Sequence, residues 1–204
     1  MKRRIATLLT LALSTTLLLG GCGDSSTNSK EIVGVEIQEH VAEMANRSVE
    51  MNNIQDRVKI MNEDLTKLKY KIKAGTVDAI TVNPPYKAKN SGLINERDTK
   101  TIARHEISCT LEDIIIESAR ELKSSGNLYM IHKTERLVDI LSLMRKYKIE
   151  PKRIRYVYSD ITKPPVMVLV EGRKCSKPHI ITEPPLVIYN QDGSYTDEII
   201  RIYN

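Results

Sequence analysis

The stretch VDAITVNPPY, residues 77–86, decides the fold. Its first six residues form a short run rich in apolar and β-branched side chains, which predicts a strand over 77–82. Asn83-Pro84 ends that strand abruptly, because proline has no N–H and restricts the residue before it. In an open α/β sheet, ligands bind beyond the carboxyl ends of the strands. We therefore expect Asn83-Pro84-Pro85-Tyr86 to lie at a binding edge.

The same four residues suit one kind of chemistry. Two prolines fix the backbone, so the Asn83 side chain and the Pro84 carbonyl can form a rigid pair of acceptors. Such a pair fits an exocyclic amine with two N–H donors, and it leaves the nitrogen lone pair ready to attack an electrophilic methyl group. Tyr86 adds a flat face for an extruded base. The alternative is a plain turn, since Asn-Pro commonly initiates one.

Strand and helix patterns alternate around this stretch. The predicted strands cover 32–36, 58–61, 77–82, 128–131, 154–158 and 166–170, and the predicted helices cover 38–52, Thr110 to Ser125-Gly126, and 137–144. The segments 186–189 and 195–202 flank Asp192-Gly193 and predict a hairpin. This order indicates an α/β fold with βαβ units on a mostly parallel sheet, and its last two strands before the hairpin predict an antiparallel edge.

Carboxylates close two of the earlier strands. Glu36 ends the first, and Asp64 follows the second. A carboxylate in the first position can accept hydrogen bonds from ribose hydroxyls, and one in the second can receive an adenine amino group. Each alone is more often a solvated loop acid. Their order before the Asn83 motif favours a cofactor site.

These motifs together resemble a known family, the S-adenosylmethionine-dependent N6-adenine methyltransferases. The similarity covers about residues 30–204. Its most specific motifs resemble those of the bacterial enzymes that modify an adenine next to the anticodon of valine tRNA. It rests on VGVEIQ at 33–38, NEDL at 62–65, NPPY at 83–86, ARHE at 103–106 and KYKIEPKRIR at 146–155. The resemblance implies a Rossmann-like class I methyltransferase fold.

The resemblance also implies roles for particular residues. Glu36 would bind the ribose of S-adenosylmethionine and Asp64 its adenine ring, with Asn83 beside the cofactor. The target adenine would be held by Asn83, Pro84, Pro85 and Tyr86. No metal is implied, because the sulfonium of the cofactor already provides the leaving group. The expected partner is tRNA.

The candidate RNA contacts are basic side chains in two regions of the chain. A cluster near the end of the 137–144 helix can grip phosphates, although it can equally be a solvated helix end. The segment around Arg104 can lie at the mouth of the site or form a charged helix start. The candidates are Lys87, Lys89, Arg104, His105, Lys152, Arg153 and Arg155.

The chain departs from the family at its start. The usual first strand and its acidic, glycine-rich cofactor loop have no counterpart, since Gly20-Gly21 precede no helical pattern. That strand would lie centrally, between the strands that end at Glu36 and Val82. Its loss would leave two unpaired edges. Either a leader has been joined to a truncated enzyme, or the apolar N-terminal segment fills the vacant strand position.

The first thirty residues predict a different cellular location from the one that residues 31–204 predict. Basic residues 2–4, the apolar run 5–19 and Leu19-Gly20-Gly21-Cys22 resemble a lipoprotein signal with a lipidation site at Cys22. A short buried helix is the alternative. We thus divide the chain into a signal segment and tether, 1–30, and an incomplete methyltransferase domain, 31–204. Without the three leader cations the 31 basic residues become 28 against 26 acidic ones, so the net charge falls from +5 to +2.

Two functions follow from these observations. The first is methyl transfer to an adenine N6 in RNA, in the cytoplasm, impaired to the extent that the cofactor loop is needed. The second is a membrane-anchored lipoprotein, tethered through Cys22, whose body binds or scaffolds without catalysis. Retention or cleavage of the leader separates the two.

Overall fold

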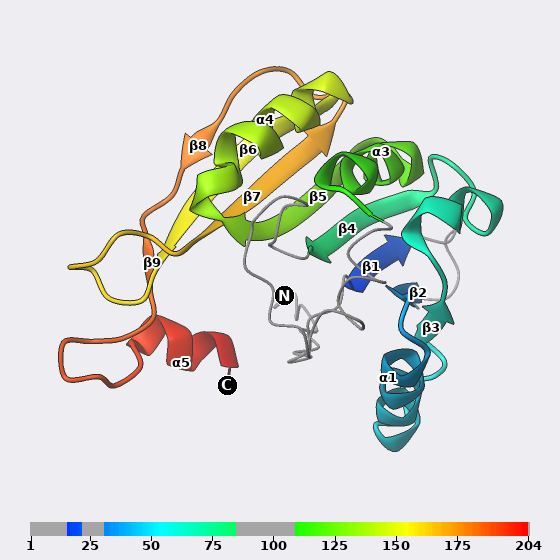
Figure 1. The fold of residues 1–204 in the computed structure, drawn as a ribbon, viewed down its shortest axis with the longest axis horizontal. Helices are drawn as coiled ribbons and strands as arrows, with labels where there is room; N and C mark the ends of the chain where they lie inside the picture. Colours follow the sequence, from blue (N-terminus) through cyan, green and yellow to red (C-terminus); the bar gives the residue numbers. More distant parts are fainter. Residues whose placement is uncertain (1–15, 22–30, 85–108, 204) are drawn as a thin grey trace, which may run out of the picture.

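One mixed sheet organises the protein. The computed structural model describes residues 16–21, 31–84 and 109–203. Within them the strand order is β3-β2-β1-β4-β5-β7-β6-β8, with β9 also beside β6 (Figure 1). The strands are β1 (Thr16–Gly21), β2 (Glu31–Glu36), β3 (Val58–Asn62), β4 (Val77–Asn83), β5 (Leu122–Lys133), β6 (Ile149–Tyr158), β7 (Met167–Lys174), β8 (Ile181–Thr182) and β9 (Leu186–Val187).

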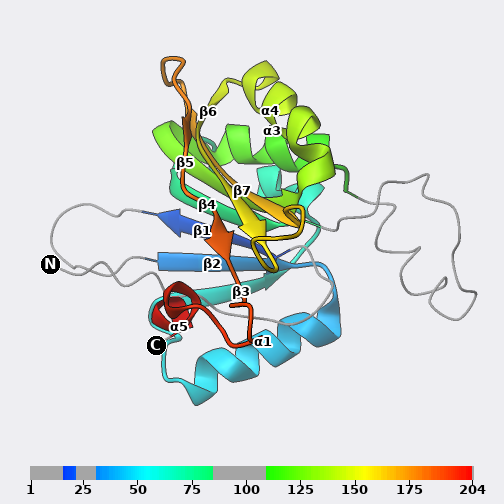
Figure 2. The same ribbon diagram turned by 90° about the vertical axis from the view of Figure 1, so that its left-hand side faces the viewer.

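The helices pack against different parts of this sheet. They are α1 (Glu39–Met51), α3 (Leu111–Glu121), α4 (Leu137–Lys146) and α5 (Asp197–Tyr203), with the 3₁₀ turns η1 (Leu65–Tyr70) and η2 (Thr134–Arg136). Helix α1 packs against β2 and β3, whereas α3 contacts η1 and α4, and α4 contacts β6 (Figure 2). None of the helices in the described part of the chain is long and apolar enough to span a membrane.

The strand directions confirm a mostly parallel α/β sheet. Strands β2 and β3 pair in parallel, as do β4 and β5. The only two strands of the described sheet that run the other way are β1 and β7. Strand β7 lies between β5 and β6, which gives the predicted antiparallel arrangement near one edge of the sheet.

Strand β1 occupies the central position that the family's first strand would fill. Its backbone pairs with β2 on one side, Leu17 opposite Val35, and with β4 on the other, Leu17 opposite Val82. Both ladders are antiparallel, so β1 runs against its neighbours. The structure therefore supports the second explanation for the missing strand, in which the N-terminal segment fills the vacant position. This places Thr16–Gly21 in the same sheet as residues 31–204.

Local sequence signals fix most element boundaries. The Thr110 hydroxyl accepts from the Asp113 N–H at 3.2 Å, and the Asp113 carboxylate accepts from the Thr110 N–H at 2.8 Å, so a capping box starts α3 as expected. The helix ends at Glu121, four residues before the predicted stop at Ser125-Gly126. The reason is that Leu122 is already extended, fully buried and paired with Val77.

The predicted C-terminal hairpin is wrong in its second half. Tyr189 and Tyr195 form a single antiparallel bridge around the Asp192-Gly193 turn, but the chain then enters α5. Helical geometry turns Ile199 inward, where it packs with Val157 and Leu186 in a small second core. A strand would alternate its side chains and could not bury the same face in this way.

Glu121 is the most deeply buried carboxylate of the described residues. Leu68, Ile80, Ile115, Leu128 and Ile140 of the main core are fully buried as well. Glu121 is 0% exposed, its Oε1 accepts from Arg120 at 2.7 Å, and its Oε2 has no hydrogen-bond partner among the described residues. Burial raises the pKa of Glu121 to about 7, Arg120 opposes that rise and Glu117 adds to it.

The central position of β1 predicts a large effect of proline within it. Leu18 lies opposite Gly34 on β2 and Thr81 on β4, so Leu18→Pro removes an N–H from a strand that is paired on both sides. We expect a loss of about 3 kcal/mol or more of unfolding free energy. Urea unfolding followed by circular dichroism measures it. Leu18→Val keeps the N–H and is the control. If the proline variant were as stable as wild type, β1 could not be paired on both sides within the sheet.

The buried carboxylate predicts a pH-dependent stability. Because the folded-state pKa of Glu121 lies above its ordinary value of 4.5, its stabilising protonated form is lost as pH rises toward and through about 7. We expect ionisation of this group to lower the free energy of unfolding by up to about 3 kcal/mol between about pH 5 and pH 8. Glu121→Gln should flatten that slope in urea unfolding, whereas Glu43→Gln on the exposed side of α1 should not. A slope unchanged in Glu121→Gln would show that the carboxyl ionises freely in the fold.

Candidate functional site

The candidate site lies at one edge of the sheet, where the parallel strands end. Glu36 ends β2, Asn62 ends β3 and Asn83 ends β4. The Asn62 amide donates to the carbonyls of Glu36 at 2.9 Å and Ile37 at 3.1 Å, which ties the first two strand ends together. The predicted cofactor and substrate residues that the structure describes therefore share one edge.

Glu36 is the best-defined acceptor at this edge. Its side chain is only 3% exposed, and its Oε1 accepts from the Gln38 N–H at 2.8 Å where α1 begins. Its Oε2 is buried without a hydrogen-bond partner among the described residues. A buried carboxylate oxygen without a donor is costly. A hydroxyl group of a ligand would satisfy it, as the predicted ribose contact requires.

Asp64 already has a structural role. Its Oδ1 accepts from the Thr66 N–H at 2.9 Å and from the Thr66 hydroxyl at 2.8 Å, so it caps the turn η1. Asp64 also lies near Cys109, whose pKa is raised to about 12 by burial and then by Asp113 and Asp64. Because both capping bonds use Oδ1, the other oxygen stays outside the cap. The predicted contact with the cofactor adenine would add to the cap without replacing it.

Asn83 is the last residue of β4, and Pro84 follows it. The Asn83 side chain is exposed, whereas Pro84 is buried, so the backbone is anchored while the amide can reach a ligand. Asn83 pairs with Thr16 of β1, and Val35, next to Glu36, pairs with the neighbouring Leu17. Glu36 and Asn83 thus end strands two ladder spacings apart, roughly 10 Å. Pro85 and Tyr86 fall outside the described residues.

The glycines of the N-terminal segment lie at the opposite edge. Gly21 pairs with Glu31 at the start of β2 and with Val77 at the start of β4. Because β1 is antiparallel to both, Thr16 and not Gly21 is the end of β1 that reaches Asn83. The glycines of β1 therefore cannot supply a cofactor loop beside Glu36.

Two of the predicted RNA contacts are engaged in ion pairs. Arg153 pairs with Glu171 and Glu183, each at 2.6 Å, and Arg155 pairs with Glu198 at 2.7 Å. The Arg155 Nε also donates to the Pro184 carbonyl at 2.8 Å. These bonds fasten the chain after β7 and helix α5 to β6, which is a structural role.

The remaining RNA candidates fall into two groups. Lys152 donates to the Lys177 carbonyl at 3.1 Å, so its ammonium also contacts the chain itself. Lys87, Lys89, Arg104 and His105 lie outside the described residues. RNA contact by these residues stays a prediction.

The sequence patterns did not single out two features of this edge. His132 is buried near the end of β5, and burial, followed by Arg136, lowers its pKa, so the ring is neutral at pH 7. An open hollow of about 870 Å³ lies between the 159–163 loop and the 187–196 segment. Tyr189 and Tyr195 could have indicated it, had they not been assigned to strands.

Comparison with known proteins is consistent with this geometry. Residues 11–115 match the family model described as N-6 DNA Methylase. The matched range begins before β1 and ends within α3. It therefore includes the strand ends at Glu36 and Asn83.

Two curated relatives extend the similarity beyond that range. A tRNA1(Val) (adenine(37)-N6)-methyltransferase of Porphyromonas gingivalis is 29% identical over 177 residues, which is 84% of this chain and 68% of the relative. The enzyme of the same name from Dyadobacter fermentans is 26% identical over 174 residues, 83% of this chain and 69% of the relative.

A solved structure supports the fold alone. A protein of Agrobacterium tumefaciens, described as a predicted O-methyltransferase, superposes with a TM-score of 0.64 at 18% identity. The match covers 82% of this chain and 74% of the other. Even the reversed central strand leaves the overall arrangement similar.

The two roles of Asp64 can be separated by substitution. Serine caps a turn about as well as aspartate, so Asp64→Ser should keep stability within a few tenths of a kcal/mol, whereas Asp64→Ala should lose about 1 kcal/mol. Neither side chain reaches a ligand, so both variants should bind S-adenosylmethionine about tenfold more weakly in calorimetry. Thermal unfolding monitors the cap. Wild-type affinity in both variants would limit Asp64 to capping.

Proposed function

The chain belongs to the N-6 DNA Methylase family, and from this premise we propose that it transfers a methyl group from S-adenosylmethionine to the N6 amine of an adenine in RNA, most specifically in tRNA. One observation carries the proposal. The exposed Asn83 amide and the Pro84 backbone stand at the same sheet edge as the buried, unpartnered Glu36 oxygen.

The described residues fit the cofactor at its ribose and adenine. Glu36 Oε2 is an acceptor in need of a donor, and a ribose hydroxyl is one. Asp64 lies one strand further out, where an adenine amine can reach it. Residues 1–15 lie outside the described residues. When bound, S-adenosylmethionine supplies a methyl group activated by a sulfonium centre.

Asn83 and Pro84 would prepare the amine for attack. The Asn83 side-chain oxygen and the Pro84 carbonyl each accept one N–H of the adenine N6. This holds both hydrogens in place and leaves the nitrogen lone pair directed at the methyl carbon. The bound cofactor would supply the methyl group to this nitrogen, and the surplus proton of the methylated amine would pass to water. The neutral His132 nearby adds no charge that would repel the sulfonium.

The choice of RNA over DNA rests on the curated relatives. Both are named for tRNA, and each aligns with more than four fifths of this chain. The family description names DNA, but the exocyclic amine that Asn83 would hold is the same group in adenine of DNA and of RNA. A tRNA substrate and S-adenosylmethionine support a location of the working enzyme in the cytoplasm.

Membrane tethering through Cys22 is the second proposal, and it conflicts with the sheet. The signal-like pattern of residues 1–22 supports it. Cleavage before Cys22 would, however, remove the whole of β1 and leave β2 and β4 without their shared partner. A folded methyltransferase therefore requires that the segment be kept. We favour the tRNA function because the residues of β1 cannot both be removed by cleavage and form the central strand of the sheet.

The catalytic proposal predicts a separation of binding from turnover. Asn83→Ala removes an acceptor that orients the amine, so methyl transfer to tRNA should fall on the order of 10²-fold. The affinity for S-adenosylmethionine should change much less, because the ribose acceptor Glu36 is intact. Transfer of a radiolabelled methyl group to a tRNA transcript and calorimetry on the full chain measure the two quantities.

Glu36→Gln is the matched comparison for that experiment. It should weaken cofactor binding first, since the amide replaces the unpartnered carboxylate oxygen. Undiminished methyl transfer by Asn83→Ala would contradict the assignment of the site. A folded wild-type chain that binds no S-adenosylmethionine would contradict the proposed function as a whole.

A further inference from the structure

We propose that the hollow between the 159–163 loop and the 187–196 segment binds an unpaired base of the RNA substrate, a few nucleotides from the target adenine. The proposal rests on the proposed function for its substrate class. It adds a second contact point, built on Tyr189, which neither the family motifs nor the predicted RNA contacts include.

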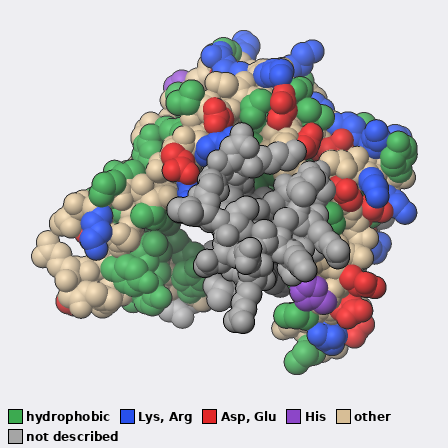
Figure 3. Space-filling model, in the orientation of Figure 1, with side chains coloured by type: hydrophobic (Ala, Val, Ile, Leu, Met, Phe, Trp, Pro, Cys, Tyr) green, Lys and Arg blue, Asp and Glu red, His purple; other side chains and the backbone are tan. Residues whose placement is uncertain are grey.

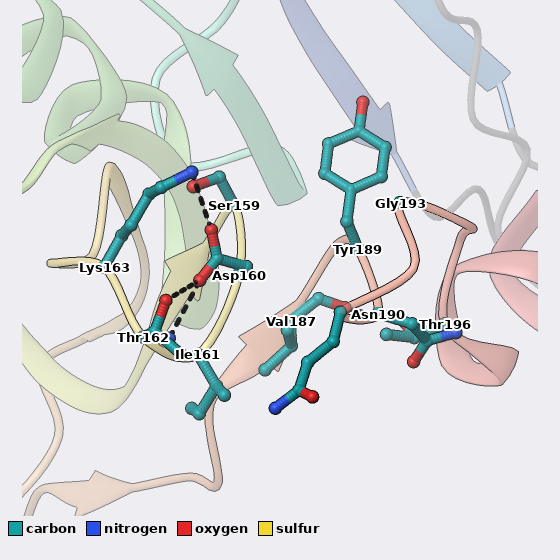
Figure 4. A pocket seen from close by; sticks show the side chains of 11 residues that line it. Ser159, Asp160, Ile161, Thr162, Lys163, Val187, Tyr189, Asn190, Gly193 and Thr196 are labelled. Atoms are coloured by element: carbon teal, nitrogen blue, oxygen red, sulfur yellow. Dashed lines mark hydrogen bonds and ion pairs between the residues drawn. The ribbon is translucent and has the colours of Figure 1, made fainter.

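The two walls of the hollow are held in shape by their own hydrogen bonds. On one side the Asp160 carboxylate accepts hydrogen bonds from the Thr162 N–H, at 2.9 Å, and from the Thr162 hydroxyl (Figure 4). The same carboxylate forms an ion pair with Lys163 at 2.9 Å. The other side is lined by Val187, Tyr189, Asn190 and Thr196. The Thr196 hydroxyl donates to the Val187 carbonyl at 2.7 Å, which closes the second wall on itself.

Tyr189 forms a ready stacking platform at this wall, and the Tyr195 ring packs against it. Their rings stack with centroids 5.1 Å apart and an interplanar angle of 24°, while the side chains remain 40% and 54% exposed. The backbone bridge between the two residues and the Asn190–Ser194 bonds keep them in register. Stacking on a preformed aromatic surface contributes about 1–3 kcal/mol per base and tolerates any sequence.

The charges in the hollow favour a base over a phosphate. Its only charged lining residues in the described chain are Asp160 and Lys163, which pair with each other. Hydrogen bonds to Thr162 and Lys163 lower the pKa of Asp160 to about 2, so the pair stays ionised and neutral overall at working pH. A phosphate would meet no free cation. A base would meet an aromatic ring and the amides of Asn190 and Gln191.

Other apolar groups extend the same surface. Figure 3 shows hydrophobic side chains gathered over β9 and α5, next to this hollow. The exposed apolar side chains of α5 are Ile200, Ile202 and Tyr203. Water-exposed rings and aliphatic groups of this kind suit unstacked bases, which present flat apolar faces.

The hollow also lies within reach of the target site. Strands β4 and β6 are three ladder spacings apart, and the pairings place Val82 level with Ile154. Ser159 lies five residues after Ile154, just past the end of β6, toward the same sheet edge as Asn83. From the strand spacing and rise, Asn83 and the hollow are roughly 20 Å apart. A few nucleotides of single strand span such a distance.

The test compares ring removal with ring retention in the full chain. Tyr189→Leu removes the platform and Tyr189→Phe keeps it, while Tyr70→Leu removes a remote tyrosine that is 76% exposed on η1. Binding of a fluorescein-labelled oligoadenylate is read by anisotropy, and the KM for a tRNA transcript by methyl transfer. We expect about a tenfold weaker Kd and higher KM for Tyr189→Leu only, with kcat at saturating tRNA nearly unchanged.

A measurement on the unaltered protein guards against a folding defect. Photo-crosslinking of wild type with a 4-thiouridine-containing RNA should label the peptide that includes Tyr189. Wild-type Kd and KM in a folded Tyr189→Leu variant, or crosslinks confined to other peptides, would overturn the proposal. Oligoadenylate binding that depends on Tyr189 without methyl transfer would instead contradict only the proposed function.

Discussion

The pairing of Thr16–Gly21 with a strand on each side is the constraint on which the rest of the structure depends. Strands β2 and β4 do not touch through hydrogen bonds except through β1. Glu36, the proposed cofactor acceptor, belongs to the β3-β2 part of the sheet, and Asn83 belongs to the β4-to-β8 part. Their separation is thus set by the backbone of a strand that contributes no predicted reactive group. A chain without this strand would keep the proposed site residues and lose their geometry.

Much of the fold could be predicted because local signals agreed with tertiary packing. The Thr110 capping box, the strand–helix–strand order from Glu31 to Asn62 and the stop at Pro84 each have a nearby physical cause. The direction of β1 could not be predicted, since apolar alternation reads the same both ways along a strand. Helix α5 was missed because its decisive contact, Ile199 with Val157, joins residues distant in sequence.

The candidate site was predictable in the same uneven way. Glu36 and Asn83 were identified because each ends a strand, and parallel strands bring such positions together. Arg153 and Arg155 look like free cations in the sequence, but their partners Glu171, Glu183 and Glu198 come from later segments. A cluster of positive charge therefore says little about phosphate binding until the carboxylates around it are known. The same ion pairs hold the second wall of the hollow against β6.

The antiparallel course of β1 has a practical consequence for handling the protein. Thr16, the first residue of β1, lies opposite Asn83, so this strand begins at the edge of the sheet that carries the proposed site. In a parallel strand Thr16 would lie at the opposite edge. An affinity tag fused directly before Thr16 would accordingly join the protein beside the proposed substrate path. Helix α5 ends the chain on a separate small core, so its end is the better point of attachment for purification or immobilisation.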